Sequence, residues 1–396
     1  MNMKILVTGA KGFIGKNLVA GLRNRNYKDI FEFDIDTKEE LLEEYCKEAD
    51  FVFNLAGINR PQRVEEFMEG NCDFVANLLN TLRKHDNPCP ILLSSSVQAE
   101  LDNPYGLSKR AGEELYLAYG KETGAKVFVY RLPNVFGKWC RPNYNSAVAT
   151  FCNNIALGLP ITINDPEVIL NLVYIDDVIE EFIKVLEKSK VGKEQSLNGE
   201  DRQECFQREE KQKEEKQEDE YVHIPTVYQV RLGDIADLIY SFRDSRENLT
   251  LPDLSDGFTK KLYSTYLSYL PADQFAYPLK MNVDERGSFT EFIRTKDRGQ
   301  VSVNVSKPGI VKGNHWHHTK NEKFLVVAGR GVIRFRTLND DEIISYFVNG
   351  DELQVVDIPP GYTHNIENLG ESDMVTIMWA NEPFDKERPD TYYLEV

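Results

Sequence analysis

The feature that most limits what this chain can fold into is a glycine-spaced turn directly after its first apolar run. Ile5-Leu6-Val7-Thr8 is followed by Gly9-Ala10-Lys11-Gly12-Phe13-Ile14-Gly15, which has the spacing G-x-x-G-x-x-G, and a helical stretch follows. Glycines permit the tight turn and let the backbone approach a pyrophosphate at the positive N-terminus of a helix. The pattern predicts a strand, a turn and a helix that bind a dinucleotide. The expected contacts are Gly9, Gly12, Phe13, Ile14 and Gly15.

The first half of the chain repeats this alternation of short apolar runs and helical stretches up to about residue 190. Such a pattern predicts a parallel sheet with helices on both faces, because strands buried on both sides are apolar throughout. We therefore expect an α/β, doubly wound, Rossmann-like domain over residues 1–245. Its predicted strands are Lys4–Thr8, Asp29–Phe33, Phe51–Leu55, Pro90–Ser94 and Lys126–Arg131.

The second half has a different character. Helical periodicity over Val230–Phe242 closes the first domain, and apolar residues every fourth position from Phe258 to Leu270 predict a short helix in a connector, 246–280. From 281 to 396, strand-like runs separated by glycine turns predict an all-β sandwich or small barrel. These runs are Ser288–Arg294, Gln300–Ser306, Phe324–Val327, Val332–Arg336, Leu353–Ile358 and Met374–Trp379.

One segment of the first domain has a strongly biased composition. Residues 200–221 contain 15 charged side chains in 22 positions. Such a run cannot bury enough apolar surface to form a core, so we expect a solvated loop or an exposed helix inserted in the domain.

Charge and composition exclude several classes of function. The 396 residues carry a net charge of −17, which argues against a protein that binds nucleic acid by neutralising phosphates. No apolar run is long enough to span a membrane, and the N-terminal apolar stretch is too short for a signal peptide. The six cysteines form no C-x-x-C pair, which is typical of reduced thiols. We therefore expect a cytoplasmic protein.

A second set of residues suggests proton transfer beside the dinucleotide. Tyr105 and Lys109 are four residues apart and share a helix face, after three serines that end the fourth predicted strand. An ammonium group favours the phenolate and so lowers the pKa of the tyrosine, which could then exchange a proton with a carbonyl oxygen. Asp34 ends the second predicted strand, where a carboxylate accepts hydrogen bonds from the ribose 2′-hydroxyl of NAD(H). Lys11 or Lys38 could offset its repulsion of a 2′-phosphate.

With these residues the first domain resembles the extended short-chain dehydrogenase/reductase family. Further matches are Asn54-Leu55-Ala56-Gly57, Arg131-Leu132-Pro133-Asn134-Val135-Phe136-Gly137 and Tyr174-Ile175-Asp176-Asp177. The resemblance implies that the tyrosine exchanges the proton while nicotinamide carries the hydride, and that the substrate is a nucleotide sugar. It assigns Ser96 as the catalytic serine, with Ser95 as the alternative. It also adds Ala56, Gly57, Tyr105 and Lys109 to the cofactor contacts.

Histidines are concentrated in the all-β half, where four of the six fall between positions 315 and 364. His315, His317, Glu322 and His364 fit a divalent transition-metal site with room for water or substrate. Their spacing resembles both cupin motifs, G-x5-H-x-H-x4-E-x6-G and P-x-G-x2-H-x3-N; the one departure is Leu353, where a glycine is usual. We expect Zn²⁺ first among metals. His318 should face away from the ligands and be exposed.

The two halves together resemble the family of CapF-type bifunctional capsular polysaccharide precursor enzymes, in stretches such as Tyr263-Ser264-Thr265-Tyr266-Leu267-Ser268-Tyr269-Leu270 and Gly313-Asn314-His315-Trp316-His317-His318-Thr319. The resemblance implies a UDP-linked 4-keto-6-deoxy-N-acetylhexosamine as substrate. The cupin would invert carbon 3 of this UDP-2-acetamido-2,6-dideoxy-4-ketohexose, and the reductase would then convert the 4-ketone to an alcohol, in the pathway to UDP-N-acetyl-L-fucosamine. It also implies NADPH and a homodimer.

Two other interpretations stay open. The chain could be a reductase whose cupin has only a structural or sensory role, or a sugar- and cofactor-binding protein without activity. The complete set of Ser96, Tyr105 and Lys109 argues against the second. A hydrogen next to a ketone is acidic and a bound metal makes it more so, but the base that removes it is not readable. Lys312, Tyr362 and His318 are unranked candidates.

Overall fold

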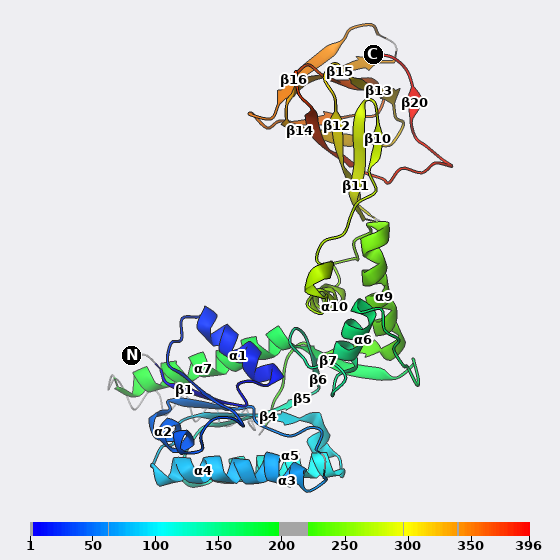
Figure 1. The fold of residues 1–396 in the computed structure, drawn as a ribbon. Coiled ribbons are helices and arrows are strands. Elements are labelled where there is room, and N and C mark those ends of the chain that lie inside the picture. The colour runs from blue at the N-terminus through cyan, green and yellow to red at the C-terminus, as the bar shows by residue number, and fades with distance from the viewer. Residues whose placement is uncertain (1–2, 62, 198–220, 296, 339) are drawn as a thin grey trace, which may run out of the picture. The chain divides into compact units, whose positions relative to one another are not determined.

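The computed structural model describes residues 3–61, 63–197, 221–295, 297–338 and 340–396 (Figure 1). The predicted charged insert, 200–221, therefore lies outside the described residues except for Tyr221. The chain divides into two compact units. The first comprises Met1–Ile239 with Ser264–Leu270, and the second comprises Tyr240–Tyr263 with Pro271–Val396.

A six-stranded parallel sheet forms the centre of the first unit. From β1 the chain adds β2 on one side and β3 on the other, so the strand order changes sense at β1 while all strands stay parallel. Such a switch point is the place where α/β sheets bind ligands. The five predicted strands are confirmed to within two residues. In spatial order the strands are β2 (Ile30–Phe33), β1 (Ile5–Thr8), β3 (Phe51–Asn54), β4 (Ile91–Ser96), β5 (Val127–Leu132) and β8 (Tyr221–Val222).

Helices cover both faces of this sheet, as the alternating sequence predicted (Figure 1). Ile5 and Val7 pack in a cluster with residues of α1 and α7, whereas Leu6 between them packs in a second cluster with residues of α2, α4 and α5. Alternate side chains of a strand point to opposite faces, so an entirely apolar strand needs two covers. The helices are α1 (Phe13–Asn24), α2 (Glu40–Glu48), α3 (Glu66–Met68), the π-helix η1 (Glu69–Asp73), α4 (Phe74–Lys84), the 3₁₀ helix η2 (Val97–Glu100), α5 (Pro104–Thr123), α6 (Ala147–Ala156) and α7 (Ile175–Leu197).

A three-stranded sheet of β6 (Asn134–Phe136), β7 (Ile169–Tyr174) and β9 (Tyr228–Arg231) corrects one sequence prediction. The helix predicted from Val230 begins only at Leu232, as α9 (Leu232–Asn248), because Val230 pairs with Leu170 across β7 and β9. Sheet pairing outweighs helical periodicity at these two residues. The connector helix is confirmed as α10 (Gly257–Leu267). Among the described residues, no helix combines the length and apolar character that a bilayer requires.

The C-terminal part of the second unit is all-β, as predicted, and its two sheets face each other across one core (Figure 1). Phe324, Val326 and Met374 reach this core from the first sheet, and Phe335 and Ile366 reach it from the second. The first sheet is β10 (Asn282–Asp284), β11 (Gly287–Thr295), β12 (Gly299–Ser306), β19 (Met374–Ala380), β14 (Glu322–Ala328) and β17 (Val355–Ile358). The second is β16 (Ile344–Asn349), β15 (Arg330–Thr337), β18 (Tyr362–Asn368), β13 (Val311–Trp316) and β20 (Tyr392–Tyr393).

Candidate active sites

The glycine turn between β1 and α1 has the shape that a pyrophosphate requires. Gly9 has a φ of +66°, and a Cβ there would lie 2.8 Å from the Ala56 backbone nitrogen. A Cβ on Gly15 would lie 2.1 Å from the Gly9 carbonyl oxygen. Gly12 is the N-cap of α1 and provides no side-chain cap, so the first-turn N–H groups at Phe13 and Ile14 are left for another acceptor. These residues fit a dinucleotide.

Asp34 follows the end of β2 and is hydrogen-bonded to the backbone of the glycine turn. Its carboxylate accepts hydrogen bonds from the backbone N–H groups of Lys11 (2.7 Å) and Ile35 (2.9 Å). The Lys11 ammonium forms an ion pair with Asp36. One of the two lysines that could offset repulsion of a 2′-phosphate is therefore already paired with a carboxylate.

Ser96, Tyr105 and Lys109 are brought together by β4 and α5. Asn103 caps α5 by accepting a hydrogen bond from the Gly106 N–H (2.8 Å), which sets the first turn where Tyr105 lies. The Ser96 side chain is close enough to Tyr105 to lower the pKa of its hydroxyl group. Ser95 instead donates to the buried Glu113 carboxylate. This geometry favours Ser96 over Ser95 as the serine beside the tyrosine.

Lys109 lies between the tyrosine and the loop that follows β3. Its Nζ is 5.9 Å from the centre of the Tyr105 ring and donates to the Ser94 carbonyl oxygen at 3.3 Å. A Cβ on Gly57 would be 3.1 Å from the same nitrogen, so the predicted cofactor loop Ala56-Gly57 contacts the predicted catalytic lysine.

The pKa of the tyrosine differs from the expectation. Burial raises the pKa of Tyr105, and the hydrogen bond with Ser96 only partly opposes this. Burial also lowers the pKa of Lys109 to about 8, against the raising effect of the Glu113 charge. The nearby lysine charge alone would lower the pKa of Tyr105, but desolvation of the hydroxyl group dominates in the protein without its ligands.

Sequence reasoning missed the charged pair behind this site. Glu113 is 1% exposed and accepts hydrogen bonds from Arg131 Nε (3.0 Å) and Nη2 (2.6 Å) as well as from Ser95. Ser95 and Arg131 are register partners on β4 and β5. The network therefore ties the strand end that carries Ser96 to the helix that carries Lys109. The signal was present: Glu113 follows Lys109 by one helical turn.

The four predicted metal ligands converge at one end of the second unit. One potential ligand atom from each of His315, His317, Glu322 and His364 lies within 4.8 Å of the others. His315 is on β13, Glu322 begins β14, His364 is on β18, and His317 directly follows β13. Glu322 Oε2 is 3.6 Å from His317 Nε2 and 3.5 Å from His364 Nε2. His318 is exposed, as predicted.

The unpaired atoms of this cluster indicate that it accommodates a cation. Nε2 of His317 and both ring nitrogens of His364 are buried without a hydrogen-bond partner. Burial lowers the pKa of His315 to about 4, so that the ring is neutral near pH 7. Burial would raise the pKa of Glu322, but the contacts to His317 and His364 outweigh it and the pKa is lowered. Three imidazoles and a carboxylate are a donor set for Zn²⁺ or a similar ion.

A support for this cluster comes from a residue that the sequence did not single out. The carbonyl oxygen of Asp390 accepts a hydrogen bond from His317 Nδ1, which leaves Nε2 for the cluster. The Asp390 carboxylate accepts the backbone N–H groups of His318 (2.9 Å), Thr319 (2.8 Å) and Lys320 (2.8 Å). Asp390 therefore fixes both the histidine and the turn after it. Asp390 lies 68 positions after Glu322 in the sequence and well beyond His364. It belongs to neither cupin motif.

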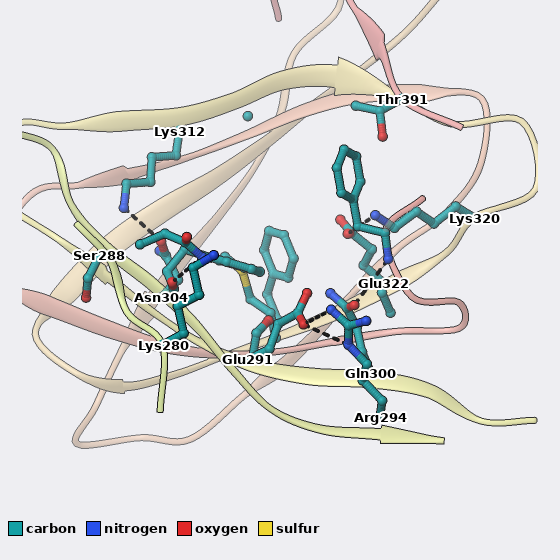
Figure 2. Close-up of a pocket in the computed structure, with 18 of the residues that line it drawn as sticks. Lys280, Ser288, Glu291, Arg294, Gln300, Asn304, Lys312, Lys320, Glu322 and Thr391 are labelled. Carbon is teal, nitrogen blue, oxygen red and sulfur yellow. Dashed lines mark hydrogen bonds and ion pairs between the residues drawn. The ribbon is translucent and has the colours of Figure 1, made fainter. Parts of the chain in front are cut away.

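The cluster lies in the wall of a large cavity of about 1160 Å³. His315, Glu322 and His364 line one part of it. Polar and charged side chains of β11, β12 and β13 line another part, including Glu291 with Arg294, and Lys312 with Asn304 (Figure 2). Apolar side chains such as Phe289, Phe324 and Met378 also line the cavity. The space accommodates a substrate larger than a single sugar, because ligand pockets are commonly 300–1,000 Å³.

Comparisons with known proteins agree with both halves. Residues 5–198 match the NAD dependent epimerase/dehydratase family, and residues 282–392 match the polysaccharide biosynthesis C-terminal domain. A Pseudomonas aeruginosa protein, UDP-2-acetamido-2,6-beta-L-arabino-hexul-4-ose reductase, is 44% identical over 394 residues, covering 100% of this chain and 99% of the relative.

Solved structures of CapF cover the full chain. The capsular polysaccharide assembling protein CapF from Staphylococcus aureus is 55% identical with a TM-score of 0.87, and each chain is covered completely. A structure of CapF with the inhibitor 3-isopropenyl-tropolone is 51% identical with a TM-score of 0.82, again with complete coverage.

The fold and the two sites thus define a two-domain protein in which a Rossmann-like domain of the epimerase/dehydratase type precedes a cupin-like β domain. More particularly, the chain belongs to the CapF family of capsular polysaccharide assembling proteins.

Proposed function

We propose that this protein is a bifunctional nucleotide-sugar enzyme of capsular polysaccharide precursor synthesis. Its cupin inverts carbon 3 of a UDP-2-acetamido-2,6-dideoxy-4-ketohexose, and its N-terminal domain then reduces the 4-ketone. The observation that carries the proposal is that one chain holds both residue sets in full, Ser96 with Tyr105 and Lys109 in one unit and the four-residue cluster in the other. The P. aeruginosa relative, a reductase of such a keto sugar by name, supports the reduction step.

In the reductase site, the residues handle the proton while bound nicotinamide supplies the hydride to carbon 4. Tyr105 is positioned to give its hydroxyl proton to the ketone oxygen as that oxygen becomes an alcohol. Ser96, whose side chain interacts with that of Tyr105, stabilises the same oxygen. The Lys109 ammonium, 5.9 Å from the ring, stabilises the phenolate left behind. The chain thereby supplies the one proton that reduction of a ketone by hydride requires.

The choice between the two nicotinamide cofactors depends on the end of β2. The family resemblance implies NADPH, but the carboxylate of Asp34 would repel a 2′-phosphate, and Lys11 is paired with Asp36. We therefore propose NADH as the preferred hydride donor of this chain. The 2′- and 3′-hydroxyls of its ribose would replace backbone N–H groups as donors to Asp34.

In the cupin, His315, His317, Glu322 and His364 would hold a divalent metal, for which Zn²⁺ is the first candidate. A bound metal acts as a Lewis acid that makes the hydrogen next to a ketone more acidic. The polar cavity walls around the cluster would bind the nucleotide sugar and limit access of water.

Product analysis tests the proposal directly. The purified protein is supplied with the UDP-4-keto-6-deoxy-N-acetylhexosamine, Zn²⁺ and either nicotinamide, and the product is examined by NMR while nicotinamide absorbance is followed. We expect absorbance to fall and the alcohol product to be inverted at carbon 3. A reduced product with unchanged configuration at carbon 3 would show that the protein is a reductase whose cupin has only a structural or sensory role. Binding without turnover would leave a protein that only binds sugar and cofactor.

A further inference from the structure

The strand that carries His315 contains a bulge that brings Lys312 into the lining of the same cavity as the metal cluster. Lys312 and His315 are three residues apart, so regular alternation would send their side chains to opposite faces of β13. The register shifts between Gly313 and His315, where Asn314 has a φ of +61°, and both Lys312 and His315 line the cavity. β-bulges commonly re-aim a side chain next to an active site.

The Lys312 amine is held by two neutral acceptors. Its Nζ donates to the Asn304 side-chain oxygen at 2.8 Å and to the Val305 carbonyl oxygen at 2.8 Å (Figure 2). Asn304 is 2% exposed and is itself oriented, because its Nδ2 donates to Ser306 Oγ at 3.1 Å. Two acceptors use both N–H groups of a neutral amine and leave its lone pair as the remaining tetrahedral direction.

The electrostatic surroundings shift the Lys312 amine toward its neutral form. Burial lowers the pKa of Lys312; the Asp284 carboxylate opposes this shift, and the Arg286 guanidinium adds to it. Asp284 is also held by Arg286, at 2.6 Å. Lys312 is half-buried, and lysines whose pKa is lowered by burial are the type that acts as a base.

The other candidate bases are less well placed. Among the described residues that line the cavity, neither Tyr362 nor His318 appears. His318 contacts Trp316 and Tyr392, with ring centres 4.5 Å and 5.0 Å away. A second lysine in the cavity wall, Lys320, pairs with Glu322 at 3.3 Å and so belongs to the ligand cluster.

The distance along the strand also suits a base. Three residue steps of a regular strand cover ~10 Å, and the bulge at Asn314 shortens this path, so the Lys312 and His315 backbones are separated by no more than about the size of a sugar ring with its substituents. A sugar whose ketone faces the cluster can therefore present the neighbouring C–H bond to the lysine.

On the basis of the proposed function, we propose that Lys312 is the catalytic base that removes the proton from carbon 3 of the keto sugar. The C–H bond breaks, its proton goes to the Lys312 lone pair, and the electron pair moves into the adjacent carbonyl to give an enolate of the sugar. Return of a proton to carbon 3 restores the ketone. When this proton comes from water on the opposite face, the centre is inverted, and the lysine gives its own proton back to water.

The test is exchange of the carbon 3 hydrogen for deuterium in heavy water, without nicotinamide, in the Zn²⁺-loaded protein. We expect Lys312→Arg and Lys312→Ala each to slow exchange by roughly 10²–10⁴-fold, the usual contribution of a general base. Ethylamine added to Lys312→Ala should restore part of the rate, with no such effect on Lys312→Arg. Lys307→Arg is the matched control, because Lys307 is an exposed lysine of the same domain that is not among the described residues lining the cavity, and it should exchange at the parent rate.

Zn²⁺ affinity, measured by chelator competition, gives a readout independent of turnover and should be the same in the parent and all three variants. Parent-like exchange by Lys312→Arg would assign the lysine a role as a cation and overturn the proposal. Failure of ethylamine to accelerate Lys312→Ala would overturn it as well, and so would loss of Zn²⁺ from both Lys312 variants. A parent protein that does not exchange carbon 3 would instead refute the proposed epimerisation itself.

Discussion

The two candidate sites differ in how complete they are without their ligands. In the reductase site the polar groups already have protein partners: Lys109 donates to Ser94, Ser96 accepts from Gln98, and Glu113 binds Arg131. In the cupin site, His317 Nε2 and both ring nitrogens of His364 are buried without a hydrogen-bond partner.

This difference has an energetic meaning. An unsatisfied buried polar group costs about 1–3 kcal/mol, so the ligand cluster destabilises the second unit until a cation neutralises it. The reductase site has no such penalty at the groups just named. We therefore expect metal to stabilise the protein through its C-terminal unit, and cofactor to act mainly through binding energy of its own.

Removing two metal ligands should have the largest effect and should separate the two sites most clearly. His315→Ala with His317→Ala should abolish metal binding and reduce carbon 3 exchange in heavy water to background, because half of the donor set is lost. Reduction of a substrate already inverted at carbon 3 should persist, since the glycine turn and Tyr105 lie in the other unit. Mass spectrometry of the recovered sugar measures the first, and nicotinamide absorbance the second. Parent-rate deuterium entry in the metal-free variant would return the cupin to a structural role.

Reduction of the ketone should depend on a single hydroxyl group, that of Tyr105. Tyr105→Phe removes the proton donor, so reduction should fall by roughly 10²–10⁴-fold. Cofactor affinity, measured by fluorescence or calorimetry, should stay near that of the parent, because the turn at Gly9 to Gly15 is unchanged. Exchange at carbon 3 should also be retained. Near-parent reduction by this variant would show that Tyr105 has been assigned the wrong role.

The support of the metal cluster should have a smaller effect. Asp390→Asn keeps the shape of the side chain but weakens its acceptance of three backbone N–H groups, which should loosen the carbonyl that orients His317. We expect metal affinity to fall about 10–100-fold, as for other outer-shell changes. Asp385→Asn is the control on the same segment, because its carboxylate bonds to Glu387 and Arg388. Equal metal affinities in the two variants would show that Asp390 does not support the metal cluster.

The smallest effect is expected for cofactor choice. Asp34→Ser removes the negative charge at the end of β2 and should lower kcat/KM with NADH by about tenfold, the value of one hydrogen bond to a charged group. The same variant should use NADPH better than the parent does, because repulsion of the 2′-phosphate is gone. Initial rates with both cofactors measure the change. A parent that already prefers NADPH would contradict the NADH proposal and restore the family expectation.

The sequence predicted the fold class of both halves, because their hydrophobic residues have different periodicities. Apolar strands between helices required helices on both faces, and Ile5, Leu6 and Val7 divide between the two clusters accordingly. The helix predicted from Val230 was wrong at its start, since pairing of β9 with β7 is a contact between distant segments.

The same division holds for the sites. By itself, the sequence determined the residue types and spacings: the glycine turn, Tyr105 with Lys109, and the two cupin motifs, because each depends on a single local element or a short motif. Only the tertiary structure decided that Asp390 orients His317, that Glu113 ties Ser95 to α5, and that a bulge aims Lys312 into the cavity. The physical reason is that hydrogen-bond partners and desolvation are set by segments far apart in sequence. Burial, which no spacing reveals, is also what raises the pKa of Tyr105 despite the nearby lysine.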